Sequence, residues 1–164
     1  MIKKLPVVKV EINGTRYTRE VDSRLLLVYF LRKVIGLKGP RVGCDTGHCG
    51  ACTILFDGKS TKSCMLLAAQ ADNSSIITVE GLLKDGKLSI LQESFSENHA
   101  LQCGYCTPGM LMSAQDLLQH NPDPTEKEIR RAIEGNLCMC TGYLNIIKAI
   151  GSASEKLRKT NSMR

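Results

Sequence analysis

The residues best suited to chemistry are eight cysteines, which fall into two groups of four. The first group has the spacing C-x4-C-x2-C-x11-C, and the second has a C-x2-C pair and a C-x-C pair separated by 31 residues. Thiolates are soft donors that bind zinc, copper(I) or iron–sulfur clusters. We expect no secretory leader, and disulfides are rare in the cytoplasm, so metal binding is the first explanation. The two groups are Cys44, Cys49, Cys52 and Cys64, and Cys103, Cys106, Cys138 and Cys140.

The first group has a specific spacing. A C-x4-C-x2-C run followed by a distant fourth cysteine is typical of a plant-type [2Fe–2S] cluster. Gly43, Gly47 and Gly50 lie within or beside this run. We expect them to let the loop wrap the cluster, because glycine accepts positive φ and lets backbone N–H groups approach the sulfurs. The alternatives are unligated thiols and a zinc site, although zinc sites usually pair two short C-x2–4-C knuckles.

The second group is less diagnostic by spacing alone. Its C-x2-C pair also fits a redox motif, and its C-x-C pair also fits zinc or copper sites. Cys106 precedes TPGMLM and Cys140 precedes TGYLNI, so both pairs lie at the start of an expected helix. Helix N-termini favour negative charge and offer free N–H donors. An anionic cluster with four thiolates fits such a position.

The elements that must position the first group are two hairpins, a helix and a strand. Strand-like runs flank residues 13–14 (Asn-Gly) and residues 57–58 (Asp-Gly), which predicts two hairpins, and Asn-Gly suits a type I′ turn. Residues 23–36 predict a helix with Ser23 as its N-cap. Residues 75–82 predict a last strand. This set is typical of a β-grasp sheet that carries a cysteine loop.

The second group is expected among four helices. They follow a predicted turn at Asp85-Gly86 and are joined by short loops, which favours a compact helical bundle. Thr125 and Glu128 have the spacing of a capping box, and Pro108 suits a first helical turn. The predicted helices are residues 88–101, 108–121, 125–136 and 142–159.

The bulk composition excludes several classes of protein. The chain of 164 residues is 43% hydrophobic, and no apolar run approaches the ~20 residues that span a bilayer. Its formal charge is +6, but the basic residues are scattered and no aromatics interleave with them. Two oxidised clusters at −2 each would lower the net charge to about +2. We therefore expect no nucleic-acid partner and a cytoplasmic location.

Three motifs carry a family resemblance: GCDTGHCGAC (43–52), LQCGYCTPGM (101–110) and GNLCMCTGY (135–143). With these motifs the chain closely resembles the iron–sulfur subunit of the molybdenum hydroxylases, which include xanthine dehydrogenase, aldehyde oxidoreductases and aerobic carbon monoxide dehydrogenase. The resemblance runs from about Lys9 to Lys156 and includes all eight cysteines. It implies an α+β fold, with a plant-type ferredoxin-like β-grasp domain at residues 1–82 and a four-helix domain at residues 83–164, each holding one [2Fe–2S] cluster.

The resemblance also implies an electron-transfer subunit of an oxidoreductase, without a substrate site of its own. In the family, this subunit passes electrons from a molybdopterin centre in a large subunit to FAD in a medium subunit. A heterotrimer or a dimer of heterotrimers is implied. The helical domain's cluster would lie nearer the pterin, Gln102 would hydrogen-bond the pterin, and Cys140 or the backbone beside it would contact the pterin edge. CDTGHCGAC leans toward the carbon monoxide dehydrogenase-like and aldehyde-oxidising branch, and an aldehyde such as glyceraldehyde is the expected substrate, with carbon monoxide as the alternative.

Two other functions remain open at this point. A structural two-zinc protein would be colourless, and a free-standing two-cluster ferredoxin would be a monomer without permanent partners. A subunit should instead expose an apolar docking surface, which we expect around Tyr105, Pro108, Met110 and Tyr143. His48 lies inside the first cysteine run, but four cysteines suffice as ligands, so we interpret it as a loop residue.

One residue departs from the family pattern: Met139 stands where the usual motif is Cys-Arg-Cys. A positive charge beside an anionic cluster favours its reduced form. We therefore expect Met139→Arg to raise the midpoint potential of the cluster held by the second group, as measured by an EPR-monitored redox titration. Met139→Leu adds no charge and is the control. An unchanged or lower potential in the Met139→Arg variant would count against this reasoning.

Overall fold

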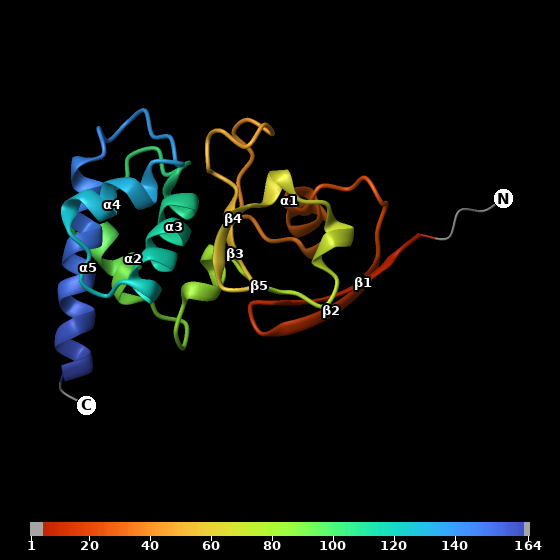
Figure 1. Cartoon of the computed structure of the whole chain (residues 1–164), viewed down its shortest axis with the longest axis horizontal. Coiled ribbons are helices and arrows are strands. Elements are labelled where there is room, and N and C mark those ends of the chain that lie inside the picture. Colours follow the sequence, from red (N-terminus) through yellow and green to blue (C-terminus); the bar gives the residue numbers. More distant parts are fainter. Residues whose placement is uncertain (1–4, 163–164) are drawn as a thin grey trace.

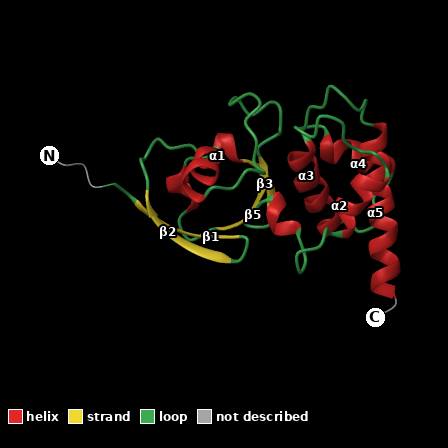
Figure 2. Ribbon diagram, turned by 180° about the vertical axis from the view of Figure 1, so that it is seen from behind, coloured by secondary structure: helices red, strands yellow, loops and turns green. Residues whose placement is uncertain are grey.

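A five-stranded sheet and a group of four helices lie side by side along the longest axis of the computed structural model (Figure 1). The structure describes residues 5–162, and the view from behind shows the same two parts (Figure 2). The strand order is β2-β1-β5-β3-β4, with β1 and β5 parallel and the other pairs antiparallel. The strands are β1 (Val7–Ile12), β2 (Thr15–Glu20), β3 (Thr53–Phe56), β4 (Lys59–Lys62) and β5 (Ser75–Ile77).

Both predicted hairpins are confirmed. Asn13 and Gly14 have φ of 50° and 79°, and Asp57 and Gly58 have φ of 48° and 82°. Positive φ at both central residues defines the type I′ turn, whose twist matches that of the strands it joins. The second hairpin matters for the site, because its β3 strand begins directly after Cys52 and its β4 strand ends just before Cys64.

The predicted helix at residues 23–36 is wrong at its start. The helix α1 (Leu27–Tyr29) begins four residues after Ser23 and continues as a π-helical segment (Phe30–Ile35). The residues before it are not helical: Ser23 and Arg24 form a turn, and the backbone after them pairs elsewhere, since the Ala68 N–H donates to the Leu25 carbonyl at 2.7 Å. Gly36 ends the segment with φ of 91°, as its position predicts.

The four predicted helices are confirmed, with shorter bounds for the first and third. Ser89 and Thr125 each accept a hydrogen bond from the backbone N–H three residues later, so α2 and α4 both begin with a capping box. Residues 75–82 are only partly a strand, since β5 gives way to a short 3₁₀ turn at Val79–Leu82. The helices are α2 (Ile90–Glu97), α3 (Thr107–His120), α4 (Glu126–Ile133) and α5 (Leu144–Ser162).

Strand β3 is shared by two hydrophobic cores. Its Ile54 packs into the core between the sheet and α1, and the next residue, Leu55, packs into the core formed by the four helices. Successive strand residues point to opposite faces, so a single strand serves both cores. The sheet and the helices confirm the predicted α+β class. The boundary between residues 82 and 83 stays a prediction.

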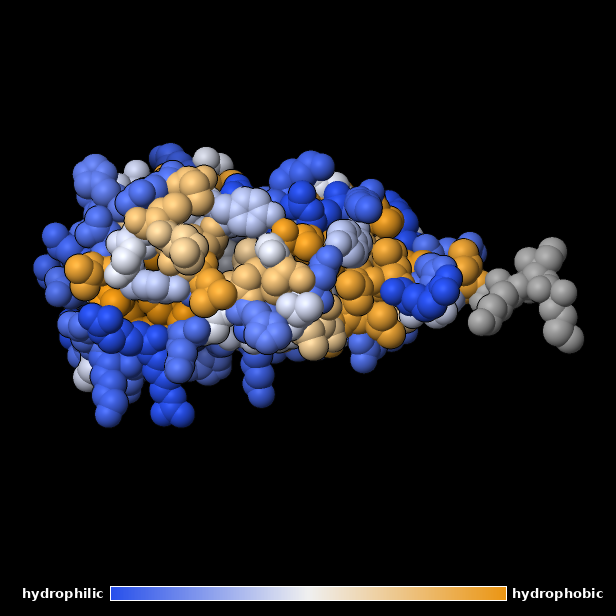
Figure 3. Space-filling view, turned by 90° about the horizontal axis from the view of Figure 1, so that it is seen from above, coloured by the Kyte–Doolittle hydropathy of each residue, from blue (hydrophilic) through white to orange (hydrophobic). Residues whose placement is uncertain are grey.

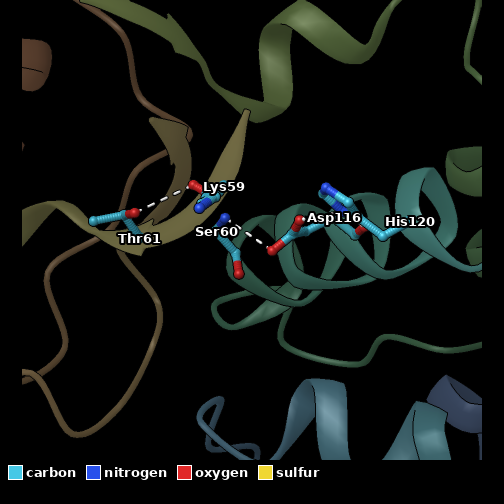
Figure 4. Close-up of polar contacts among 5 residues, drawn as sticks. All are labelled: Lys59, Ser60, Thr61, Asp116 and His120. Atoms are coloured by element: carbon cyan, nitrogen blue, oxygen red, sulfur yellow. Dashed lines mark hydrogen bonds and ion pairs between the residues drawn. The ribbon is translucent and has the colours of Figure 1, made fainter. Parts of the chain in front are cut away.

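The edge strand β4 is joined to α3 by a polar contact. The Ser60 N–H donates to Asp116 Oδ2 at 2.9 Å (Figure 4). His120 lies one turn further along α3, with its Nδ1 3.0 Å from Asp116 Oδ1. An edge strand leaves backbone N–H groups without partners, and Asp116 satisfies one of them.

Within residues 5–162, no helix is long and apolar enough to cross a membrane.

A buried asparagine joins the helices to the loop that precedes β3. Asn136 is 3% exposed, and its side-chain amide donates to the Gly50 carbonyl at 2.9 Å. Its Oδ1 accepts from the Ser113 hydroxyl of α3 at 2.7 Å. The backbones meet closely here: a Cβ atom on Gly50 would collide with the Gly135 carbonyl, and one on Gly109 would collide with the Gly50 carbonyl. Both glycines are therefore required by the close approach.

We expect Asn136→Ala to lower the free energy of unfolding by about 1–3 kcal/mol, because the Ser113 hydroxyl would remain buried without its acceptor and the Gly50 carbonyl would keep only its hydrogen bonds from Thr53. Urea denaturation followed by circular dichroism measures the loss. Asn145→Ala is the matched control, since the Asn145 side chain is exposed and makes one hydrogen bond of 3.3 Å to the His99 carbonyl. Losses of equal size in the two variants would contradict the role given to Asn136.

Candidate metal centres

The hairpin brings the first four cysteines together. Cys44 and Cys49 lie on the loop before β3, Cys52 ends that loop, and Cys64 lies in the short turn after β4. Thr53 pairs with Lys62 in the antiparallel register, so the residues just outside this pair approach each other. The Ser63 hydroxyl donates to the Cys52 carbonyl at 2.7 Å and fixes this end of the hairpin.

Backbone N–H groups point at the outermost sulfur of this group. The N–H groups of Cys49 and Thr46 donate to Cys44 Sγ at 3.4 Å and 3.5 Å. These hydrogen bonds lower the pKa of the Cys44 thiol to about 6. Burial acts in the opposite direction on Cys52, whose thiol pKa is raised to about 11. A buried thiol of this kind becomes a thiolate when a metal supplies the compensating charge.

The second four cysteines meet at the N-terminus of α3. Cys103 and Cys106 lie on the loop that leads into this helix, and Cys138 and Cys140 lie on the loop between α4 and α5. The Cys138 N–H donates to the Tyr143 hydroxyl at 2.8 Å, which holds the second loop in place. Burial raises the pKa of the Cys106 thiol to about 12.

Each group divides into two thiol pairs. In the second group Cys140 Sγ donates to Cys103 Sγ at 3.5 Å, and Cys138 adds to the rise that burial causes in the pKa of Cys106. In the first group Cys44 adds in the same way to the raised pKa of Cys49, after burial, and Cys64 to that of Cys52. All eight are free thiols.

This pairing fits a two-iron cluster better than a single ion. Among residues 5–162, no three His, Cys, Asp or Glu side chains converge closely enough to hold one metal ion. A [2Fe–2S] cluster instead takes two ligands at each of two irons, which separates the four sulfurs into two pairs. His48 contacts the Thr46 hydroxyl at 3.0 Å and is exposed, in keeping with a loop residue.

The three glycines predicted to shape the first loop differ in what they do. Gly47 and Gly50 have φ of 74° and 70°, as expected. Gly43 has no positive φ, and its contribution is space: a Cβ atom there would lie 2.8 Å from Cys49 Sγ. The expectation that these glycines let the loop wrap a bound cluster stays a prediction.

The two groups face a common cavity. This cavity of about 180 Å³ is lined by Cys49 from the first group, by all four cysteines of the second, and by Leu137 and Met139 among others. The Leu137 N–H donates to the Cys49 carbonyl at 2.9 Å. Cys49 and Cys138 are therefore connected by one hydrogen bond and one peptide unit. That is a short covalent and hydrogen-bonded route between the two groups.

Part of the predicted docking surface is buried. Pro108 and Met110 lie in the core of the helical part, because α3 turns this face toward β3, and Tyr143 is half-buried. Apolar side chains are nevertheless exposed around the second group, and Met139 is 97% exposed. Gln102, Cys103 and Cys140 are exposed beside them. Figure 3 views the molecule from above and shows apolar atoms gathered over the helical part and the middle of the molecule. The exposed apolar residues near this group are Leu101, Tyr105, Leu137, Met139 and Leu144.

Three side chains that shape these centres were missed by the sequence reasoning. Asn136 lies inside the GNLCMC motif, but nothing in the sequence marks its side chain as buried. Arg41 and Lys62 contact carbonyls within the two cysteine motifs. No spacing rule points to either of them, because each reaches its carbonyl from a distant part of the chain.

Comparison with known proteins agrees with this geometry. A family described as "[2Fe-2S] binding domain" matches residues 78–151, which include the second cysteine group. The nicotine 6-hydroxylase small subunit of Paenarthrobacter nicotinovorans is 52% identical over 154 residues, which are 94% of this chain and 93% of that protein. The chain belongs to the small iron–sulfur subunits of the molybdenum hydroxylases. Such subunits are parts of oxidoreductase complexes.

Solved structures of the molybdenum hydroxylases share the fold. Quinoline 2-oxidoreductase from Pseudomonas putida 86 has a chain of 47% identity with a TM-score of 0.92, covering 96% of this chain and 98% of that one. The aldehyde oxidoreductase from Desulfovibrio desulfuricans ATCC 27774 is 35% identical with a TM-score of 0.91, covering 94% of this chain and 17% of that one. The same fold is thus found in a chain of similar length and within a much longer one.

Proposed function

We propose that this chain carries electrons through two [2Fe–2S] clusters, one held by each group of four cysteines. The observation that carries the proposal is the division of each group into two thiol pairs. In this proposal a plant-type ferredoxin-like β-grasp domain, residues 1–82, holds the first cluster, and a four-helix domain, residues 83–164, holds the second. When bound, each cluster takes up and releases one electron.

The chain's own residues hold the clusters and set the path between them. N–H groups at Cys44 favour the thiolate form that ligation needs, and burial at Cys52 and Cys106 keeps water from the inner sulfurs. The hydrogen bond from Leu137 to Cys49 joins the two centres through the protein backbone. Asn136 holds that segment in place through Gly50.

The second cluster faces a partner in this proposal. Cys103 and Cys140 are exposed beside an apolar surface, which supports docking of a large molybdopterin-binding subunit there. Gln102 would then hydrogen-bond the pterin, and Cys140 or its backbone would contact the pterin edge. The first cluster would pass electrons to a medium FAD-binding subunit. In this proposal the three subunits form a heterotrimer, or a dimer of heterotrimers, in the cytoplasm.

The two rival functions make different demands. Two structural zinc ions would require four convergent thiolates at each site, and the paired thiols do not favour this. A free-standing ferredoxin would gain nothing from the exposed apolar side chains around Cys103 and Cys140.

The iron and sulfide content of the chain tests the two-cluster proposal. The purified chain should contain about four irons and four acid-labile sulfides, and its dithionite-reduced form should give two distinguishable [2Fe–2S] EPR signals. Cys52→Ala should remove one signal and Cys106→Ala the other, each halving the iron content. His48→Ala is the control and should keep both signals. Zinc without sulfide, or one signal from an intact sample, would exclude the two-cluster proposal.

In this proposal the large partner subunit selects the substrate of the complex. Two relatives at 52% and 47% identity act, by name, on nicotine and quinoline, and the aldehyde oxidoreductase is more distant at 35%. We therefore propose a nitrogen heterocycle in place of the aldehyde that the motif favoured. The complex purified through this chain should reduce an electron-accepting dye faster with nicotine or quinoline than with glyceraldehyde. Faster turnover of the aldehyde would restore the first expectation.

A further inference from the structure

An arginine from the sheet part of the chain reaches the second cysteine group. Arg41 Nη1 donates to the Gly104 carbonyl at 2.7 Å. Gly104 lies between Cys103 and Cys106, so the guanidinium is held inside the loop that carries both cysteines. Its own backbone N–H donates to the Ala51 carbonyl at 3.0 Å, which anchors it beside the first group. The side chain therefore bridges the two centres.

A tyrosine holds the guanidinium from the other side. The carbon at the centre of the Arg41 guanidinium lies 5.3 Å from the centroid of the Tyr105 ring, within cation–π distance. The Tyr105 hydroxyl donates to the Val42 carbonyl at 2.7 Å. Each segment thus donates one side-chain hydrogen bond to the backbone of the other. Arg41 is half-buried, so its position and its charge are both well defined.

The second group has no cation of its own. The motifs LQCGYCTPGM and GNLCMCTGY contain no Lys or Arg, and Met139 between Cys138 and Cys140 is apolar. The first group has an equivalent cation on its own side: Lys62 Nζ donates to the Gly47 carbonyl at 2.6 Å. Gly47 lies between Cys44 and Cys49, so the two contacts correspond. Each cysteine loop therefore has one cation bound to a carbonyl between two of its cysteines.

We propose that Arg41 is a positioning residue that sets the reduction potential of the second cluster from the other part of the chain, and that Lys62 has the same role at the first cluster. This inference rests on the proposed two-cluster function. A cluster gains one negative charge when it is reduced, and a fixed cation close by stabilises that charge. The half-buried position limits screening by salt.

The test is an EPR-monitored redox titration of the full chain with both clusters present. Arg41→Gln keeps hydrogen-bonding capacity and removes the charge. We expect it to lower the reduction equilibrium constant of the second cluster about tenfold, which is ~59 mV for one electron, and to change the first cluster by much less, because the guanidinium binds the second loop. Lys62→Gln is the matched variant and should lower the potential of the first cluster more than that of the second, because Lys62 Nζ binds the Gly47 carbonyl and lies near Gly135 without a hydrogen bond to it. Arg41→Lys keeps the charge and should retain most of the original potential.

Several outcomes would overturn the proposal. The potential of the second cluster could stay unchanged in Arg41→Gln, or both clusters could shift equally in either variant. If Arg41→Gln fails to hold the second cluster, Arg41→Lys decides: a potential near that of the unmodified chain supports the role of charge, and a tenfold fall contradicts it. The iron and sulfide content of the unmodified chain distinguishes a failure of the proposed function from a failure of this inference. Their absence defeats the proposed function, whereas two clusters with unshifted potentials defeat this inference alone.

Discussion

The close backbone contact at Gly50 is the constraint on which the rest of the structure depends. Asn136 donates to the Gly50 carbonyl, and any side chain at Gly50 or Gly109 would push the two parts of the chain apart. One residue away on each side, Leu137 donates to the Cys49 carbonyl. Cysteines of both groups, among them Cys49, Cys52, Cys106 and Cys138, therefore lie within three residues of this contact. The fold holds its two metal centres together by excluding side-chain volume between them.

Around that contact, charge and burial differ from one cysteine to the next. The Cys52 thiol is buried and the Cys106 thiol is half-buried, and the pKa of each is raised, while Cys44 is half-buried and accepts two backbone N–H hydrogen bonds that lower its pKa. Arg41 and Lys62 add one cation to each loop. The two centres thus share a similar arrangement although one lies on a hairpin loop and the other at the start of a helix. Because the surroundings of the two groups are so similar, any difference in their chemistry depends on small differences in charge and exposure.

Much of the architecture could be predicted from the sequence, because its signals are local. The positive-φ pairs at residues 13–14 and 57–58, the capping box at Thr125 and the stop at Gly36 each depend on a few neighbouring residues. The cysteine spacings belong to the same class of signal. Local signals mispredict the structure where a distant part of the backbone provides hydrogen bonds. At Leu25 the carbonyl accepts from the Ala68 N–H, and the helix begins two residues later.

The burial of Met110 and the reach of Arg41 could not be predicted in this way. Both depend on how the helices pack against β3, and a single sequence contains no record of that docking. The same limit applies to Asn136, whose partners are 86 and 23 residues away. Side chains that act across a domain contact are therefore the part of a metal site that spacing rules overlook.

The two faces of β3 have a consequence for how such chains can diverge. Ile54 and Leu55 are neighbours in sequence but belong to different cores. A hybrid that combined the sheet of one relative with the helices of another would inherit Leu55 from one parent and its pocket from the other. Such a hybrid would be most stable where the side chain at position 55 and the helical core that receives it match in volume. Strand β3 therefore makes the packing of the sheet part and the packing of the helical part depend on each other.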